Sequence, residues 1–119
     1  MNMIFHQQQP TKSRLCGQAC VAMLAGVDLD TAILAFDGWR KGTTPQRVIQ
    51  ALRALGVACG DDMERGELPP RAMLIIKYPR GGRHWCILWD YELYDPGASE
   101  AKVQHWSRGR VEQFLPLYC

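Results

Sequence analysis

The stretch LCGQACVAML (residues 15–24) places two cysteines four residues apart at the start of an apolar run. Four residues is close to one helical turn, so the apolar positions fall on a single wide helix face. Ser13 is predicted to cap this helix and Gly26 to end it. The spacing therefore puts Cys16 in the first turn and Cys20 one turn deeper, in the core.

Two more helices are expected before residue 60. The segment DLDTAILAFDG (28–38) predicts a short helix capped by Asp28 or Asp30. The segment TPQRVIQALRALG (44–56) predicts a longer one, with Thr44 as its cap and Pro45 in its first turn. The turn-rich segment GDDMERGELPP (60–70) then joins this helical half to the rest of the chain.

Beyond residue 70 the pattern changes to strands. AMLIIKY (72–78) and HWCILW (84–89) are apolar runs, and ELYDP (92–96) follows a very short turn at Asp90 and Tyr91. The tail predicts a strand near residues 103–106 and a short helix near residues 110–115. This order predicts a single α+β domain over residues 1–119, with an N-terminal helical layer on a C-terminal antiparallel sheet.

Composition narrows the class of protein. Of 119 residues, 47% are hydrophobic and 22% are charged, and the formal net charge is +2, which is ordinary for a globular domain and too mild to favour nucleic acid or a membrane as partner. No apolar stretch approaches the roughly 18 residues of a membrane span, and MNMIFHQQQP lacks a secretion-signal pattern, so a cytoplasmic protein is expected. The basic residues before HW are interpreted as a solvated loop; they are Arg71, Lys77, Arg80 and Arg83.

The five cysteines are an odd number, which favours free thiols over a disulfide framework. A cysteine in the first turn of a helix faces unpaired N–H groups and the positive end of the helix dipole, and both lower its pKa. Cys16 is therefore the candidate nucleophile, whereas Cys20, Cys59 and Cys86 are expected in the core. Cys16 and Cys20 together would supply two zinc ligands, but no Cys-x-x-Cys or close histidine pair completes a site, so neither metal nor cofactor is expected.

A thiol nucleophile needs a base, and three histidines are available. His84 opens a predicted strand after the flexible PRGGR loop, and Asp95 lies at the far end of the returning strand, so the hairpin brings the two side by side. His6 and His105 are ranked behind. Trp85, next to His84, is expected to border the site, while the four tryptophans are interpreted as core or cleft wall in preference to a stacking platform.

The order CGQACVAML, then HWCILW, then YDPG resembles the papain-like cysteine peptidases of the bacteriocin-processing type, which cut double-glycine leader peptides. The resemblance implies Cys16 as nucleophile, His84 as general base and acid, and Asp95 as the orienting carboxylate. It also implies a glutamine that donates to the oxyanion. The family has that glutamine six residues before the cysteine, where this chain has Pro10, so Gln9 is the candidate and Gln8 the reserve.

The residue before the cysteine also departs from the family, since Leu15 stands where an acid is common; this bears on the substrate. The resemblance implies cleavage of peptide or isopeptide bonds in a peptide or protein. The same triad performs deamidation and acyl transfer, so the acceptor stays open. A papain-fold toxin acting on RNA and a non-catalytic binding module are the alternatives, and oligomeric state is not predicted.

Overall fold

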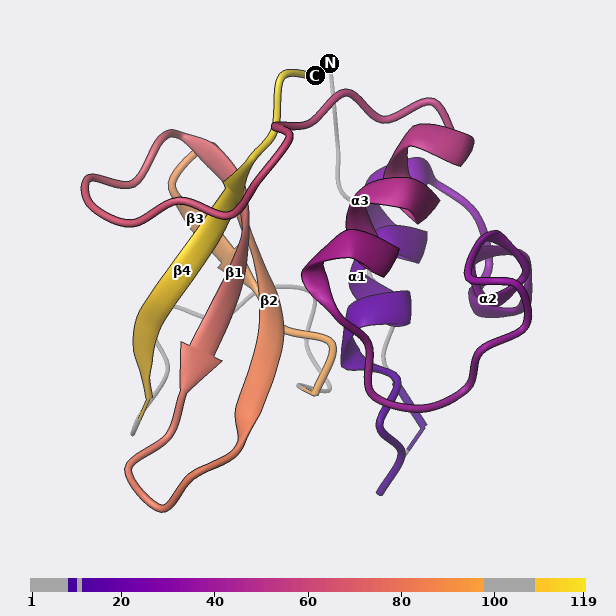
Figure 1. Cartoon of the computed structure of the whole chain (residues 1–119), viewed down its shortest axis with the longest axis horizontal. Coiled ribbons are helices and arrows are strands. Elements are labelled where there is room, and N and C mark those ends of the chain that lie inside the picture. Colours follow the sequence, from indigo (N-terminus) through magenta and orange to yellow (C-terminus); the bar gives the residue numbers. More distant parts are fainter. Residues whose placement is uncertain (1–8, 11, 98–108) are drawn as a thin grey trace.

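The computed structural model describes residues 9–10, 12–97 and 109–119. Within these residues three helices precede four strands, which form one antiparallel sheet in the order β3-β2-β1-β4. Figure 1 shows the helices gathered on one side of the sheet. The predicted α+β class, with helices first and sheet second, is confirmed. The elements are α1 (Cys16–Ala25), α2 (Leu29–Ala35), α3 (Pro45–Ala54), β1 (Arg71–Lys77), β2 (Arg83–Trp89), β3 (Glu92–Tyr94) and β4 (Arg110–Pro116).

Helix α1 is central because its side chains are nearly all small or apolar. All of residues 17–23 are buried, and the helix contacts α2, α3 and strand β2. A helix without a polar face must be covered on all sides. Its C-terminal end is the predicted one, since Gly26 adopts the left-handed conformation with φ 69°.

The predicted cap of α1 is wrong. Leu15, not Ser13, occupies the N-cap position, and no side chain caps the helix. Ser13 lies two residues earlier, where its hydroxyl accepts a 3.4 Å hydrogen bond from the Leu15 N–H. The first-turn N–H groups of α1, beside Cys16, are therefore not covered by a capping side chain.

Helices α2 and α3 begin where the sequence predicts. The Asp28 carboxylate accepts a 2.7 Å hydrogen bond from the Thr31 N–H, and the Thr44 hydroxyl accepts one of 3.4 Å from the Arg47 N–H. Pro45 is the first residue of α3, where the missing N–H of proline costs no hydrogen bond within the helix. The buried stripe of α3 faces the core with Val48, Ile49, Ala51 and Leu52.

Strands β2 and β3 form the predicted hairpin. Asp90 and Tyr91 have φ values of 51° and 63°, the pair of left-handed conformations that closes a tight two-residue turn. Trp89 pairs with Glu92 and Ile87 with Tyr94, so the strand after the turn returns along β2. This register carries the chain back toward the beginning of β2.

The tail differs from its prediction. Residues 110–115 were expected to be helical, but they form strand β4, which pairs with the edge of β1. Leu115 lies among the core residues on the helix side of the sheet, and Phe114 belongs to the cluster on the other side. Pairing to a distant edge thus overrides the local pattern. The strand expected near residues 103–106 lies outside the described residues.

The sheet has an apolar cluster on each face. Its helix-facing side contributes alternate residues of β1 and β2 to the main core, including Met73, Ile75, Trp85 and Ile87. The opposite side holds Leu74, Cys86 and Leu88, with Leu68 and Tyr78 against them. Cys59 and Cys86 are buried, as predicted.

In the described part of the chain, no single helix is long and apolar enough to cross a membrane. Helices α1 and α2 pass that test of length and composition only as a pair bent by 104°.

Candidate active site

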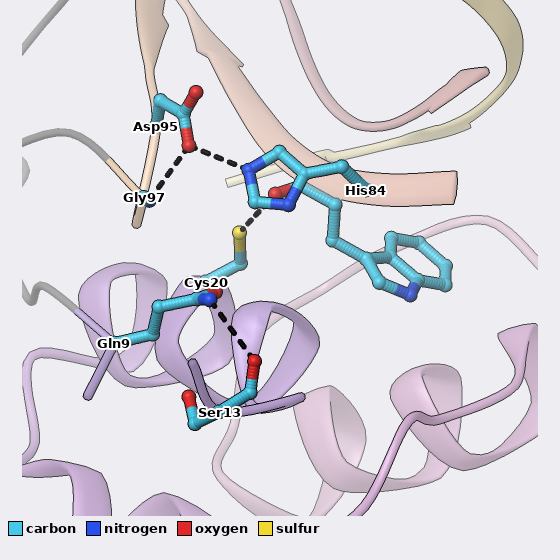
Figure 2. Close-up of polar contacts among 7 residues, drawn as sticks. Gln9, Ser13, Cys20, His84, Asp95 and Gly97 are labelled. Atoms are coloured by element: carbon cyan, nitrogen blue, oxygen red, sulfur yellow. Dashed lines mark hydrogen bonds and ion pairs between the residues drawn. The ribbon is translucent and has the colours of Figure 1, made fainter. Parts of the chain in front are cut away.

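His84 and Asp95 form the polar centre of the site. His84 is the second residue of β2 and Asp95 follows the end of β3, and the hairpin brings the imidazole Nε2 to 2.6 Å from the Asp95 Oδ1. The same Oδ1 accepts a 2.7 Å hydrogen bond from the Gly97 N–H, and Figure 2 shows Asp95 linked to both partners. The carboxylate is thereby fixed in position against the ring.

Cys16 lies opposite this pair, at the first residue of α1 and half-buried. Burial acts to raise the pKa of its thiol. Hydrogen bonds from His84 and from the backbone of Trp85 and Gly17, together with the charge of His84, outweigh burial and leave the pKa lowered. Cys16 and His84 thus line the same cleft from the helix and from the sheet, and each shifts the pKa of the other.

The imidazole shows the complementary shift. Burial favours the neutral ring, but hydrogen bonds with Asp95, Cys16 and Cys86 raise the pKa of His84 strongly. A thiol whose pKa falls beside an imidazole whose pKa rises is the electrostatic signature of a thiolate–imidazolium pair. Each residue thereby favours the charged form of the other.

An open cleft of about 1040 Å³ lies over these residues. Cys16, His84, Gln9 and Trp85 all line it. Its other walls come from the loop before α3, the ends of β1 and β2, and strand β4. Trp85 borders the cleft as predicted, although its side chain is buried.

Gln9, the predicted oxyanion donor, reaches the same cleft. Its backbone N–H donates a 2.8 Å hydrogen bond to the Pro96 carbonyl, which ties it to the residue after Asp95. Its side-chain Nε2 donates a long 3.4 Å bond to the Ser13 carbonyl, as Figure 2 shows. The weak bond leaves this donor ready to exchange partners. The reserve candidate Gln8 lies outside the described residues, as do His6 and His105.

Two residues of the α1 stretch matter in ways the sequence analysis missed. Gln18 is fully buried, and its Nε2 donates hydrogen bonds of 3.1 and 2.9 Å to the carbonyls of Trp39 and Lys41. It attaches the loop that leads into the cleft wall at Thr43 to the helix that carries Cys16. A glutamine inside an otherwise small and apolar helix is the signal that would have revealed it.

Gly17 is the second missed residue. A Cβ at this position would lie 2.5 Å from the Thr43 Cγ2 and 3.2 Å from the Trp85 Cδ1. Only glycine therefore lets the cleft wall and the Trp85 ring close around the residue after Cys16. One turn further along, the Cys20 thiol donates a 3.4 Å hydrogen bond to the Trp85 carbonyl, which holds α1 against β2 (Figure 2).

His84, Cys86 and Asp95 each carry a potential metal ligand, and their ligand atoms lie within 4.8 Å of one another. Zinc needs about four ligands, and two tetrahedral nitrogen or oxygen ligands at ~2.0 Å lie about 3.3 Å apart. The group has three members among the described residues, and the His84–Asp95 separation of 2.6 Å is a hydrogen-bond distance. The cluster fits a hydrogen-bonded histidine better than a zinc centre.

The chain matches no protein-family model, no curated protein and no solved structure. Its function is therefore inferred from the chemistry of the site.

Proposed function

We propose that this protein is a cysteine hydrolase of papain-like fold, with Cys16 as nucleophile, that cleaves peptide or isopeptide bonds. The observation that carries the proposal is the pairing of Cys16 with His84, backed by Asp95. Helix α1 presents the thiol, the β2–β3 hairpin presents its base, and one cleft exposes both. Thiol catalysis requires a nucleophile and an adjacent base that both reach the substrate.

In the first half of the reaction, the Cys16 thiolate attacks the amide carbonyl carbon. A C–S bond forms, and the carbonyl oxygen becomes an oxyanion beside the first-turn N–H groups of α1 and the Gln9 amide. The C–N bond then breaks, and the His84 imidazolium gives its proton to the leaving nitrogen. An acyl thioester remains on Cys16.

In the second half, water attacks the thioester carbonyl and His84 accepts the proton of that water. The C–S bond breaks, a carboxylic acid leaves, and Cys16 returns to the thiolate. Asp95 holds the ring through Nε2, so we assign Nδ1 to the proton exchange with Cys16. Asp95 is thus a positioning residue that also stabilises the imidazolium.

The proposal is tested by trapping the intermediate. An activated acyl ester should leave an acyl group on Cys16, visible as a mass increase in the intact protein. Cys16→Ala should show no such adduct, while Cys119→Ala, which removes an exposed thiol, should acylate like the unaltered protein. Cleavage of peptides in ¹⁸O-water should place the heavy oxygen in the new carboxylate.

Two results would overturn the proposal. Acylation that persists in Cys16→Ala would contradict the role of Cys16 as nucleophile. Peptide cleavage that persists in that variant would assign the hydrolysis to other residues.

A further inference from the structure

The cleft over Cys16 carries an excess of positive charge. Apart from the Cys16–His84 pair, the charged lining residues in the described part of the chain are one carboxylate, Glu112, and four cationic side chains: Arg14, Arg65, Lys77 and Arg83. The chain as a whole has a formal charge of only +2, so positive charge is concentrated in the cleft to a degree that the composition does not indicate. Such a concentration attracts groups of the opposite sign.

On the sheet side, Glu112 contacts two of the cations, and the charge of a third, Arg65, acts on it. The Arg83 Nε lies 2.7 Å from the Glu112 Oε1, and the Lys77 Nζ lies 3.8 Å from Oε2. The Arg83 hydrogen bond lowers the pKa of Glu112; burial opposes it, and the charges of Arg83, Lys77 and Arg65 add to the lowering. One ionised carboxylate cannot neutralise three cations, so positive charge remains on this wall.

On the helix side, Arg14 stands two residues before Cys16. It is exposed, and it forms no ion pair with any residue that the structure describes. Its guanidinium lies along the backbone of Gly42, where an added Cβ would be 3.3 Å from Nη2. The positive end of the α1 dipole lies on the same side. Both walls beside the nucleophile are therefore cationic.

We propose that this cleft selects peptide or protein segments with acidic residues next to the bond that Cys16 attacks, with Arg14 and Arg65 as specificity-determining residues. The inference deepens the proposed function and rests on it. A guanidinium binds a carboxylate through two parallel hydrogen bonds, so each arginine offers a directional site for an Asp or Glu side chain. The cleft volume, at the upper end of the roughly 300–1,000 Å³ typical of ligand pockets, accommodates a short extended segment.

A single-stranded nucleic acid fits the cleft less well. Proteins that bind such strands stack the bases on exposed aromatic rings. Among the tryptophans that the structure describes, the one that lines this cleft, Trp85, is 6% exposed, and the partly exposed Trp39 lies outside the cleft. The Glu112 carboxylate also interrupts the cationic lining, which disfavours a chain with a phosphate at every nucleotide.

The test is binding to Cys16→Ala, which cannot cleave its ligand. Fluorescent peptides of equal length, carrying paired Asp, Asn or Lys residues in an alanine background, should bind in that order. The Asp peptide should bind about tenfold tighter than the Lys peptide in ~50 mM salt, and the difference should shrink in ~500 mM salt. Arg14→Glu and Arg65→Glu, each added to Cys16→Ala, should abolish the difference. Arg40→Glu, the same change of charge outside the cleft, should preserve it.

Equal binding of the Asp and Lys peptides would overturn the inference, and so would an oligouridine RNA that binds more tightly than the Asp peptide. Failure of the proposed function is separable from these results. If the Asp peptide binds selectively but the unaltered protein neither acylates nor cleaves, the acidic site stands and the hydrolase does not. If the protein cleaves Asp and Lys peptides at equal rates, the hydrolase stands and the acidic site does not.

Discussion

The carboxylate of Asp95 lies 2.6 Å from the imidazole of His84. The two residues belong to opposite arms of a hairpin, and neither is fully buried. Their contact depends on the turn at Asp90 and Tyr91, which returns the chain without spare residues. Because Asp95 is also held by the Gly97 N–H, its position against the ring does not depend on the ring alone.

Replacing Asp95 by Asn should lower activity by roughly 10²-fold or more, since an amide stabilises the imidazolium less than a carboxylate does. The pH dependence should move as well. Asp95 raises the pKa of His84, so its loss lets the imidazolium deprotonate at lower pH and deprives the Cys16 thiolate of its counterion. The alkylation midpoint of Cys16 should therefore move upward. Asp62→Asn, which alters an exposed carboxylate outside the hairpin and the cleft, is the matched control and should change neither quantity.

Cys16 should be the first thiol to react with iodoacetamide at about pH 6, because only the thiolate reacts and its pKa is lowered. Burial is the main cause that raises the pKa values of Cys20, Cys59 and Cys86, which should react last. Peptide mapping after partial labelling measures the order, with the exposed Cys119 as the accessible reference. Reaction of Cys16 at the same rate as the buried thiols would contradict a thiolate at the start of α1.

Gly17→Ala should destabilise the protein by about 1–3 kcal/mol, the usual cost of overpacking a tight site. The new methyl would collide with the Thr43 Cγ2 and press on the Trp85 ring, and thermal unfolding measures the cost. Adding Thr43→Ser removes the nearest colliding carbon and should restore part of the lost stability. A double variant no more stable than Gly17→Ala would show that the crowding lies elsewhere.

Gln18→Leu should cost about 1–3 kcal/mol, because the carbonyls of Trp39 and Lys41 lose their donor. The loop they belong to leads to Thr43 and Thr44, which line the cleft, so peptide binding should weaken together with stability. Amide hydrogen exchange should accelerate in residues 39–43. Gln50→Leu, on the exposed side of α3, is the control and should leave loop exchange unchanged.

Local sequence signals predicted most helix ends and the hairpin, whereas the predicted Ser13 cap of α1 was wrong. The helix limits followed from Asp28, Thr44 and Gly26, whose roles depend on backbone hydrogen bonds and conformation within a few residues. The hairpin followed from two apolar runs with a two-residue interval. The position of Asp95 beside His84 was predictable for the same reason, since a hairpin converts spacing along the chain into proximity.

Features that depend on distant partners were not predictable in the same way. The segment that forms β4 carries apolar residues that would also suit a helix, and its strand conformation comes from pairing with β1. The same strand brings Glu112 to Lys77 and Arg83, so the charge of the cleft was hidden as well. Gln18 supports the site because it binds the carbonyls of a loop that is distant in the sequence. In each case the deciding contact joins segments far apart in the sequence.

The docking of α1 on β2 also has a kinetic consequence. The candidate nucleophile and its base belong to opposite halves of the chain, and contacts between distant segments carry the loop-closure entropy that slows folding. A refolding chain should regain its helical circular dichroism before Cys16 regains selective reactivity toward iodoacetamide. The time at which Cys16 regains selective alkylation thus reports the late docking of α1 on the sheet during folding.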